Sequence, residues 1–128
     1  MSDKELIAMA EEASKSAYTP YSHFNVGAAI LTASGRVYTG CNVENASFGA
    51  TICAERCAAV KAVSGGDKEF LKIAIISSSG TYTHPCGICR QFLAEFAAKD
   101  CVFVLNDNTD GVRTIPFSEE FPSAFTEF

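Results

Sequence analysis

Two short cysteine motifs constrain what this chain can fold into more than any other feature: Thr51-Ile-Cys-Ala-Glu-Arg56 and Pro85-Cys-Gly-Ile-Cys89. Cys86 and Cys89 stand three residues apart, so on a helix they lie on one face and can bind the same metal ion. Cys53 would be the third ligand, which leaves a fourth coordination position open for water. Glu55 follows Cys53 closely and carries a carboxylate that can act on this water. Such a combination is typical of a catalytic zinc site rather than a structural one.

Two other interpretations of these cysteines stay open. Cys57 lies four residues after Cys53, so the spacing also allows a closed structural site of four cysteines, although Cys57 would sit one helical turn deeper. Cys86 and Cys89 also have the spacing of a redox-active dithiol, but nothing else in the chain resembles a thioredoxin-type unit. The spacing favours the open site with three ligands and leaves both alternatives to be tested.

Glu55 and Arg56 are the charged residues next to the first cysteine. Three thiolates on Zn²⁺ leave a formal charge of about −1, which makes bound water less acidic. Arg56 can donate a hydrogen bond to a ligating sulfur and offset that charge; the alternative is a solvated arginine on a helix surface. Glu55 can serve as a general acid and base; the alternative is a glutamate that the helix dipole favours near an N-terminus.

The composition limits the kinds of function that the chain can have. With 128 residues, of which 48% are hydrophobic, the chain is expected to form a single domain, 1–128, with a core of its own. Its 15 acidic residues outnumber the 10 basic ones, and the net charge of −5 argues against a nucleic-acid partner. Neither a signal peptide nor a membrane-spanning run is apparent, so we expect a cytoplasmic protein with no membrane partner. In that reducing compartment, six cysteines indicate metal binding or burial rather than disulfides.

Hydrophobic periodicity and turn signals predict alternating helices and strands in an α/β layer fold. Ser2 and Glu5 form a capping box at the start of the first helix. The tail, 117–128, is rich in phenylalanine and shows no clear element. The predicted helices span 2–17, 53–63 and 86–98, and the predicted strands span 24–31, 36–41, 71–76, 101–105 and 112–116.

The order of these elements brings the two cysteine motifs together. Units of strand, helix and strand prefer right-handed crossovers and parallel strands. The helices that follow strands 36–41 and 71–76 would then begin at the same edge of the sheet. These helix starts carry Cys53 and the pair Cys86 and Cys89, so the fold explains how such distant cysteines can share a metal. Two helix N-termini, each with roughly +0.5 of effective charge, would face that metal.

Further blocks extend the match beyond the cysteines: Phe24-Asn-Val-Gly-Ala-Ala, Gly40-Cys-Asn-Val-Glu-Asn45, Cys53-Ala-Glu-Arg56 and Pro85-Cys-Gly-Ile-Cys-Arg-Gln91. Their order and spacing, from about residue 18 to 105, resemble the cytidine deaminases of the small, homotetrameric, zinc-dependent type. The resemblance implies a three-layer α-β-α sandwich with a mixed sheet of about five strands.

The resemblance also implies an activity, the hydrolytic deamination of cytidine and 2′-deoxycytidine to uridine and 2′-deoxyuridine, as in pyrimidine salvage, with release of ammonia. Cys53, Cys86 and Cys89 would bind one Zn²⁺ per subunit. Hydroxide on that zinc would attack C4 of the base, and Glu55 would shuttle protons among the water, ring N3 and the departing amine. The partner would be a small nucleoside.

Four residues match substrate contacts of that family. Asn42 and Glu44 correspond to a pair that binds the ribose, although such residues are more often found simply in turns. Phe24 corresponds to the aromatic ring that packs against the base, and without the resemblance it would be an ordinary strand residue. The backbone of Ala54 would help hold the polar edge of the base.

The tail carries a further expected contact. Phe125 lies where the family sends a C-terminal phenylalanine into the pocket of a neighbouring subunit, so the resemblance implies a homotetramer whose sites are completed by other chains. The alternative is a phenylalanine packed on its own domain. Phe121 and Phe128 are two other tail residues that can serve instead.

Two positions depart from the family pattern. Phe48 replaces a frequent tyrosine, so a hydrogen bond from that hydroxyl is missing, and Cys57 replaces a small hydroxyl residue. Neither change removes a group that takes part in the reaction. We interpret His23 and His84 as loop histidines rather than metal ligands, because three better ligands are present.

Three other functions compete with this interpretation. A zinc-stabilised interaction module without activity would need Cys57 as a fourth ligand. A deaminase of bases within nucleic acid is disfavoured by the acidic charge. A deaminase of aminoacyl-nucleoside antibiotics shares the zinc motifs, but Phe24 and the Asn42–Glu44 loop fit the nucleoside enzymes better.

Overall fold

The computed structural model describes residues 1–127. Helix α1 (Asp3–Ser14) starts with the predicted capping box, in which the amide of Glu5 donates to the Ser2 hydroxyl and the amide of Ser2 donates to the Glu5 carboxylate. The predicted extension of this helix to residue 17 is wrong. Tyr18 exchanges backbone hydrogen bonds with Asn42 and Glu44, so the chain has to leave the helix before it reaches Tyr18.

Five strands form one mixed sheet, as expected, and their order in the sheet is β2-β1-β3-β4-β5. The β1 strand is antiparallel to β2 and β3, β3 is parallel to β4, and β4 is antiparallel to β5. The strands are β1 (Val26–Thr32), β2 (Val37–Cys41), β3 (Phe70–Ser77), β4 (Ala97–Asn106) and β5 (Val112–Pro116).

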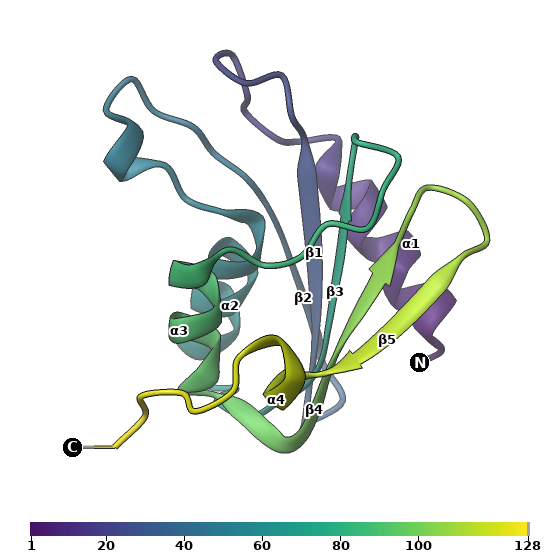
Figure 1. Ribbon diagram of the computed structural model, residues 1–128, viewed down its shortest axis with the longest axis vertical. Helices are drawn as coiled ribbons and strands as arrows, with labels where there is room; N and C mark the ends of the chain where they lie inside the picture. Colours follow the sequence, from purple (N-terminus) through teal and green to yellow (C-terminus); the bar gives the residue numbers. More distant parts are fainter. Residues whose placement is uncertain (128) are drawn as a thin grey trace.

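The strand directions bring two helix starts to one edge of the sheet. Because β2 and β3 are both antiparallel to β1, they run the same way. Helix α2 (Ala54–Ser64) follows β2, and helix α3 (Gly87–Ala94) follows β3. Both helices therefore begin near the same end of the sheet and lie beside each other (Figure 1). This confirms the topology that the sequence predicted for the two cysteine motifs.

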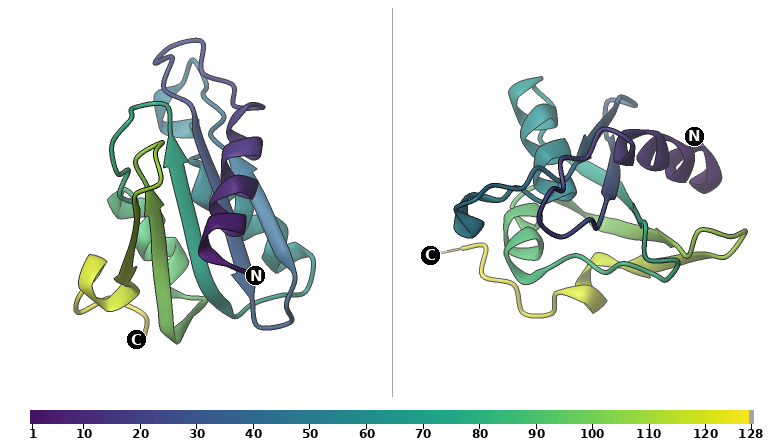
Figure 2. Two further views of the ribbon diagram at one scale, coloured as in Figure 1. Left: turned by 90° about the vertical axis from the view of Figure 1, so that its right-hand side faces the viewer. Right: turned by 90° about the horizontal axis from the view of Figure 1, so that it is seen from above.

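The helices cover both faces of the sheet, which gives the predicted three layers (Figure 2). Side chains that alternate along the strands separate two cores. The smaller core packs under α1 and consists of Leu6, Ile7, Ala10, Ala29, Ala74, Ile76 and Val104. The larger core lies under α2 and α3 and includes Ala28, Ile30, Ala58, Ala62, Phe70, Ile73, Ile75, Leu93, Phe103 and Leu105.

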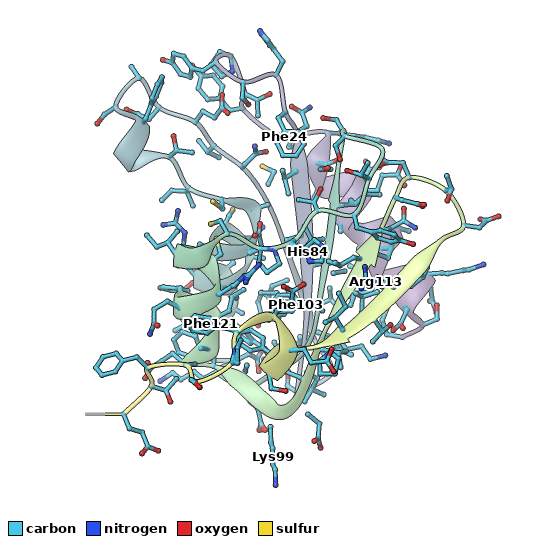
Figure 3. The ribbon with its side chains drawn as sticks, in the orientation of Figure 1. Phe24, His84, Lys99, Phe103, Arg113 and Phe121 are labelled. Atoms are coloured by element: carbon cyan, nitrogen blue, oxygen red, sulfur yellow. The ribbon has the colours of Figure 1, made fainter. Side chains whose placement is uncertain are left out.

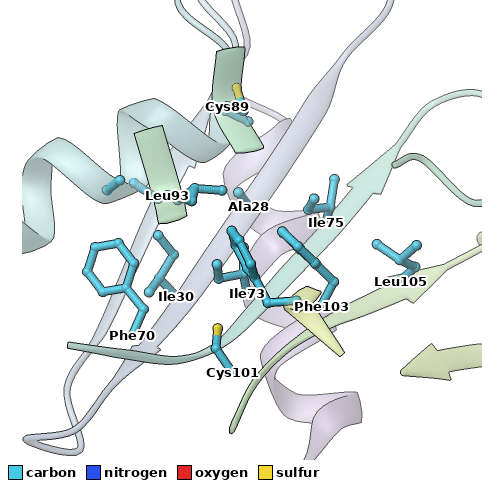
Figure 4. Close-up of a cluster of buried hydrophobic side chains, with 14 of the residues drawn as sticks. Ala28, Ile30, Phe70, Ile73, Ile75, Cys89, Leu93, Cys101, Phe103 and Leu105 are labelled. Carbon is cyan, nitrogen blue, oxygen red and sulfur yellow. The ribbon is translucent and has the colours of Figure 1, made fainter. Parts of the chain in front are cut away.

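The larger core also fixes where the two cysteine helices lie. Cys89 is fully buried in it, at the edge nearest the start of α3 (Figure 4). Helix α2 lies very close to β2, because a Cβ atom added to Gly40 would lie 2.6 Å from the carbonyl oxygen of Ala54. Only glycine permits this approach, so Gly40 sets the position of the first turn of α2.

The largest error in the sequence prediction concerns the helix expected at 86–98 and the strand expected at 101–105. Helix α3 ends at Ala94, and β4 already begins at Ala97, where it pairs with Phe70. The apolar contacts that suggested a longer helix are still made, because the ring of Phe96 packs 5.5 Å from Phe70 and 5.8 Å from Phe92. The residues expected to form the last turn of this helix thus pack against the sheet as the start of β4.

The tail also holds an element that the sequence did not indicate. A short helix, α4 (Phe117–Glu120), follows β5, and the ring of Phe117 stacks on that of Phe103 at 4.9 Å. Among residues 1–127, no helix has the length and apolar character that crossing a bilayer requires.

Candidate active site

The three predicted cysteine ligands come together at the common end of α2 and α3. Cys53 and Cys86 occupy the N-cap positions of α2 and α3, and Cys89 lies in the first turn of α3. Their sulfur atoms all lie within 4.8 Å of one another, and those of Cys53 and Cys86 are 3.7 Å apart. Cys53 and Cys86 are far apart in sequence. They meet because each lies at the start of a helix that follows one of two strands running in the same direction.

The sulfur cluster fits Zn²⁺. Two thiolates on a tetrahedral zinc with bonds of about 2.3 Å would be separated by about 3.8 Å, which agrees with the Cys53–Cys86 distance. Soft thiolate donors suit zinc better than magnesium or calcium. A group of three donors leaves the fourth tetrahedral position for water or substrate, the arrangement of a catalytic site.

Cys57 does not join this cluster. Within residues 1–127, the group of metal-ligating side chains contains only three cysteines. Cys57 lies instead over β2, where its Cβ atom would be 2.9 Å from a Cβ added to Gly40. One helical turn separates it from Cys53 and turns it toward the sheet. The geometry therefore gives no support to a closed site of four cysteines.

The Glu55 carboxyl is buried beside the sulfur cluster, with only 4% of the residue exposed. Burial is the main reason that the pKa of Glu55 is raised to about 7, and the charge of Cys53 raises it further. The hydrogen bond from its own backbone amide lowers the pKa. A carboxyl group that both holds and releases a proton near neutral pH is suited to general acid–base chemistry.

Arg56 lies against the sulfur cluster, as predicted, and not in open solvent. Its Nη2 donates to the carbonyl oxygen of Thr51 at 3.2 Å and lies 3.7 Å from the sulfur of Cys53. Its Nε is buried without a hydrogen-bond partner in the described part of the chain. A partly buried guanidinium with a buried spare donor beside thiols matches the need for positive charge near three thiolates.

The thiols themselves are unequal. A hydrogen bond from Cys89, followed by contacts with Arg56 and Cys86, lowers the pKa of the Cys53 thiol to about 5. The hydrogen bond with Cys53 and burial raise the pKa of Cys89. Cys53 therefore ionises more readily than Cys89, whose hydrogen bond stabilises the charge of Cys53.

A cavity of about 180 Å³ opens onto these groups. Phe24 stands at its rim and His84 on the loop before α3 (Figure 3). The backbone of Ala54 and the side chain of Glu55 lie at its buried end. The lining residues are Phe24, Val26, Asn42, Thr51, Cys53, Ala54, Glu55, Thr83, His84 and Cys86.

The predicted sugar-binding pair is split between this cavity and a neighbouring hollow. Asn42 lines the cavity, but its amide is also a brace: Nδ2 donates to the Phe24 carbonyl at 2.8 Å, and Oδ1 accepts from the Val26 amide at 2.9 Å. Glu44 lies in the adjacent hollow, which shares Thr51 with the cavity. Asn42 thus holds the backbone of Phe24 and Val26 in place and also faces the cavity in which a substrate would bind.

The Glu44 carboxylate is held by the aromatic loop. It accepts hydrogen bonds from the backbone amides of Tyr21 and Ser22, both at 3.1 Å, and from the Ser22 hydroxyl at 2.5 Å. The Ser22 hydroxyl is the main cause of a lowered pKa for Glu44. The Ser22 oxygen also accepts from the amide of Phe24 at 3.0 Å, so one side chain joins two predicted substrate contacts.

Phe125 lies away from the cavity of its own chain. Its carbonyl oxygen accepts a hydrogen bond from Nε2 of Gln91, and 64% of the residue is exposed. Phe121 is partly buried and packs against the larger core of its own chain. Phe128 lies outside the described residues.

Sequence reasoning missed several residues at the site. His84 lies on a loop, as predicted, and it also lines the cavity, as does Thr83. Their position directly before Pro85 and Cys86 was the available signal, because residues next to a metal ligand have to lie near the metal. For Ser22, no signal in the sequence indicated its contact with Glu44.

Comparison with known proteins places this fold and site in a family. A model described as the cytidine and deoxycytidylate deaminase zinc-binding region matches residues 1–105. Cytidine deaminase from Halalkalibacterium halodurans is 43% identical over 126 residues, which cover 98% of this chain and 96% of the relative. Cytidine deaminase from Mycobacterium tuberculosis is 50% identical over 117 residues, with coverage of 91% and 84%.

A solved structure agrees over the whole fold. The crystal structure of cytidine deaminase from Burkholderia pseudomallei superposes with a TM-score of 0.92 at 40% identity, covering 98% of this chain and 100% of that one. An α-β-α sandwich with three thiols and a buried carboxyl at two helix starts defines the class of zinc-dependent hydrolytic enzymes. Within that class, this chain belongs to the cytidine and deoxycytidylate deaminase family, and Zn²⁺ is its cofactor.

Proposed function

We propose that the chain catalyses the hydrolytic deamination of cytidine and 2′-deoxycytidine, giving uridine or 2′-deoxyuridine and ammonia. The observation that carries the proposal is the buried Glu55 carboxyl in one cavity with the Cys53 and Cys86 thiols, on a fold whose relatives are named cytidine deaminases. One water is consumed for each amine released, so the reaction requires no redox cofactor.

Cys53, Cys86 and Cys89 would hold one zinc ion per subunit. When bound, the metal supplies Lewis acidity that makes water a nucleophile near neutral pH. Arg56 would offset part of the thiolate charge from its position against Cys53. The N-termini of α2 and α3 point the same way and add positive potential.

Glu55 would move the protons of the reaction. Its carboxyl would take one proton from the attacking water and deliver it to N3 of the base, and would then take the second proton from the new hydroxyl on C4 and pass it to the departing amine as the carbonyl forms. The raised pKa suits this double role, because the group has to accept and donate in the same cycle. Burial also keeps bulk water from competing for these transfers.

The cavity walls would select the nucleoside. Phe24 would pack on the face of the pyrimidine, and the backbone of Ala54 would bind its polar edge. Asn42 and Glu44 would hydrogen-bond the sugar hydroxyls, with Glu44 presented from the neighbouring hollow by Ser22. Base and sugar would thus be bound by different loops.

We also propose that the enzyme is a homotetramer whose sites are completed by neighbouring subunits. The support is the family resemblance together with exposed aromatic side chains near the cavity and in the tail, among them Phe48, 75% exposed, and Phe125. Sedimentation analysis would test this, and a monomer with full activity would contradict it. Residues 1–128 would act as one catalytic domain in the cytoplasm, where thiols stay reduced.

The proposal is tested by following the loss of cytidine absorbance with purified, zinc-loaded protein and its Glu55→Gln variant. We expect deamination by the wild type and a fall in kcat of roughly 10² to 10⁴ in the variant, with zinc content unchanged. A zinc-loaded wild type that is inactive on cytidine, deoxycytidine, cytosine and the monophosphates would overturn the proposal. Salt-dependent binding of single-stranded DNA or tRNA would instead favour a nucleic-acid substrate.

A further inference from the structure

Cys86 is the least supported of the three cysteines. Cys89 is fully buried and Cys53 partly buried, whereas Cys86 is exposed and stands at the end of the irregular segment 78–86. Its side chain makes no capping hydrogen bond with α3. The position of its sulfur therefore depends on what holds the preceding backbone.

The guanidinium of Arg90, in helix α3, holds the backbone that precedes Cys86. Its Nε donates to the Pro85 carbonyl oxygen at 2.8 Å, directly before Cys86. Its Nη1 donates to the Glu120 carbonyl oxygen at 2.6 Å, and its Nη2 lies 3.2 Å from the Glu120 carboxylate. The guanidinium thus bridges the Cys86 segment and the end of α4.

The Glu120 carboxylate is the centre of this network. Its side chain is only 9% exposed, and each oxygen has a separate partner: Oε2 contacts Arg90, and Oε1 contacts Nδ1 of His84. His84 lies on the cavity wall, on the loop that faces α4 (Figure 3). With Nδ1 engaged by Glu120, the imidazole ring is held in one orientation beside the substrate cavity.

We propose that Glu120 is a positioning residue of the active site, acting through Arg90 on the Cys86 ligand and through His84 on the cavity wall that contacts the nucleoside. The contacts join two sequence regions that neither the cysteine motifs nor the substrate motifs connect. A buried carboxylate fully engaged by two side chains that flank a metal ligand is the arrangement by which outer-shell groups orient ligands. The zinc part of the proposal rests on the three cysteine ligands, and the wall part rests on the proposed nucleoside substrate.

Two substitutions of neighbouring glutamates test the zinc part without any turnover. Glu120→Gln removes the charge of the buried carboxylate, and Glu119→Gln makes the same change on an exposed residue one position earlier. Zinc affinity is measured by competition with a chromophoric chelator. We expect Glu120→Gln to lower the affinity roughly 10- to 100-fold and Glu119→Gln to leave it unchanged.

A second pair of variants distinguishes the contact through Arg90 from the contact through His84, and it also checks for a folding defect. Arg90→Lys keeps the positive charge but loses the donor to Pro85, so zinc affinity should fall while far-UV circular dichroism stays the same. His84→Ser should keep zinc affinity and raise KM for cytidine roughly threefold to tenfold, with kcat little changed.

Either of two results would overturn the proposal. The first is a zinc affinity in Glu120→Gln or Arg90→Lys equal to that of Glu119→Gln. The second is an unchanged KM in His84→Ser. A zinc-loaded wild type without activity on cytidine would sink the proposed function, yet the chelator competition would still decide whether Glu120 and Arg90 support the metal.

Discussion

The two ends of the sheet differ in how the chain connects its elements. At the end that carries the cysteines three connections are long, beside the short β4–β5 turn at 107–111, and at the opposite end the connections are short turns (Figure 1). The functional residues come from the long connections, as is usual for sites built on a rigid scaffold. The long connections span 15–25, 42–53 and 78–86, and the short ones span 33–36, 65–69 and 95–96.

The short-turn end is closed by its own side chains. The Tyr38 hydroxyl donates to the Asp67 carboxylate at 2.6 Å, and Nη1 of Arg36 donates to the same carboxylate at 3.2 Å. The buried Thr32 hydroxyl donates to the Arg36 carbonyl oxygen at 3.1 Å. Polar groups at this end thus have partners within the chain.

The cysteine end leaves polar groups open. Neither Cys53 nor Cys86 caps its helix with a hydrogen bond, and Nε of Arg56 is buried without a partner in the described residues. Two helix starts without a side-chain cap, next to a buried guanidinium donor without a partner, favour a bound metal and a polar substrate. The difference teaches that one end stabilises the fold, while the other end is completed by what it binds.

The largest expected effect comes from removing a ligand at the cysteine end. Cys89→Ser should lower zinc affinity by more than about 100-fold, beyond the effect of losing an outer-shell partner, and abolish deamination. Cys57→Ser is the matched control, because Cys57 lies over β2 and outside the sulfur cluster. Zinc content by atomic absorption and cytidine turnover measure both. Zinc loss from Cys57→Ser would revive the closed site of four cysteines.

The next effect concerns the loop that presents Glu44. Glu44→Gln should raise KM for cytidine roughly 10- to 100-fold with little change in zinc content, because a charged hydrogen bond to the sugar is lost. Since the Ser22 hydroxyl lowers the pKa of Glu44 from 4.5, the carboxylate stays ionised throughout the neutral range, and wild-type KM should not change between pH 8 and pH 6 on its account. An unaltered KM would place the sugar elsewhere.

A smaller effect is expected at Arg56. Arg56→Gln should reduce kcat about tenfold and keep the fold, because only the charge against Cys53 and the contact with Thr51 are lost. Arg113→Gln, on the exposed edge strand β5, is the control for loss of a positive charge. Equal kcat values in the two variants would make Arg56 an ordinary surface residue.

The smallest effect belongs to the short-turn end. Asp67→Asn should lower the melting temperature by a few degrees at pH 7 and leave kcat unchanged, because it weakens contacts remote from the cavity. The Tyr38 hydroxyl is the main cause of the lowered pKa of Asp67, so its stabilisation is present above the ordinary value of 3.8 and is lost as the pH falls further. The difference between variant and wild type should therefore shrink in acid. A drop in kcat at pH 7 would show that the two ends are coupled.

Much of the fold was predictable because its signals are local. The capping box of α1 and the interior strands β1 and β3 appear within a few residues of their expected bounds. The end of α3 was not predictable, because Ala97 is a helix former that pairs with Phe70 of β3 only in the folded sheet. Helix α4 was missed for a similar reason, since the stacking of Phe117 on Phe103 has no local signature.

The sequence by itself determined the chemistry of this protein: three thiols, a carboxylate and an arginine in spaced motifs that match one family. The tertiary structure alone decided which groups meet. It turned Cys57 toward β2, split Asn42 from Glu44, and joined His84 and Arg90 to Glu120. The physical reason is that spacing along a helix or strand fixes neighbours on one element, whereas contacts between distant elements depend on strand direction and close packing.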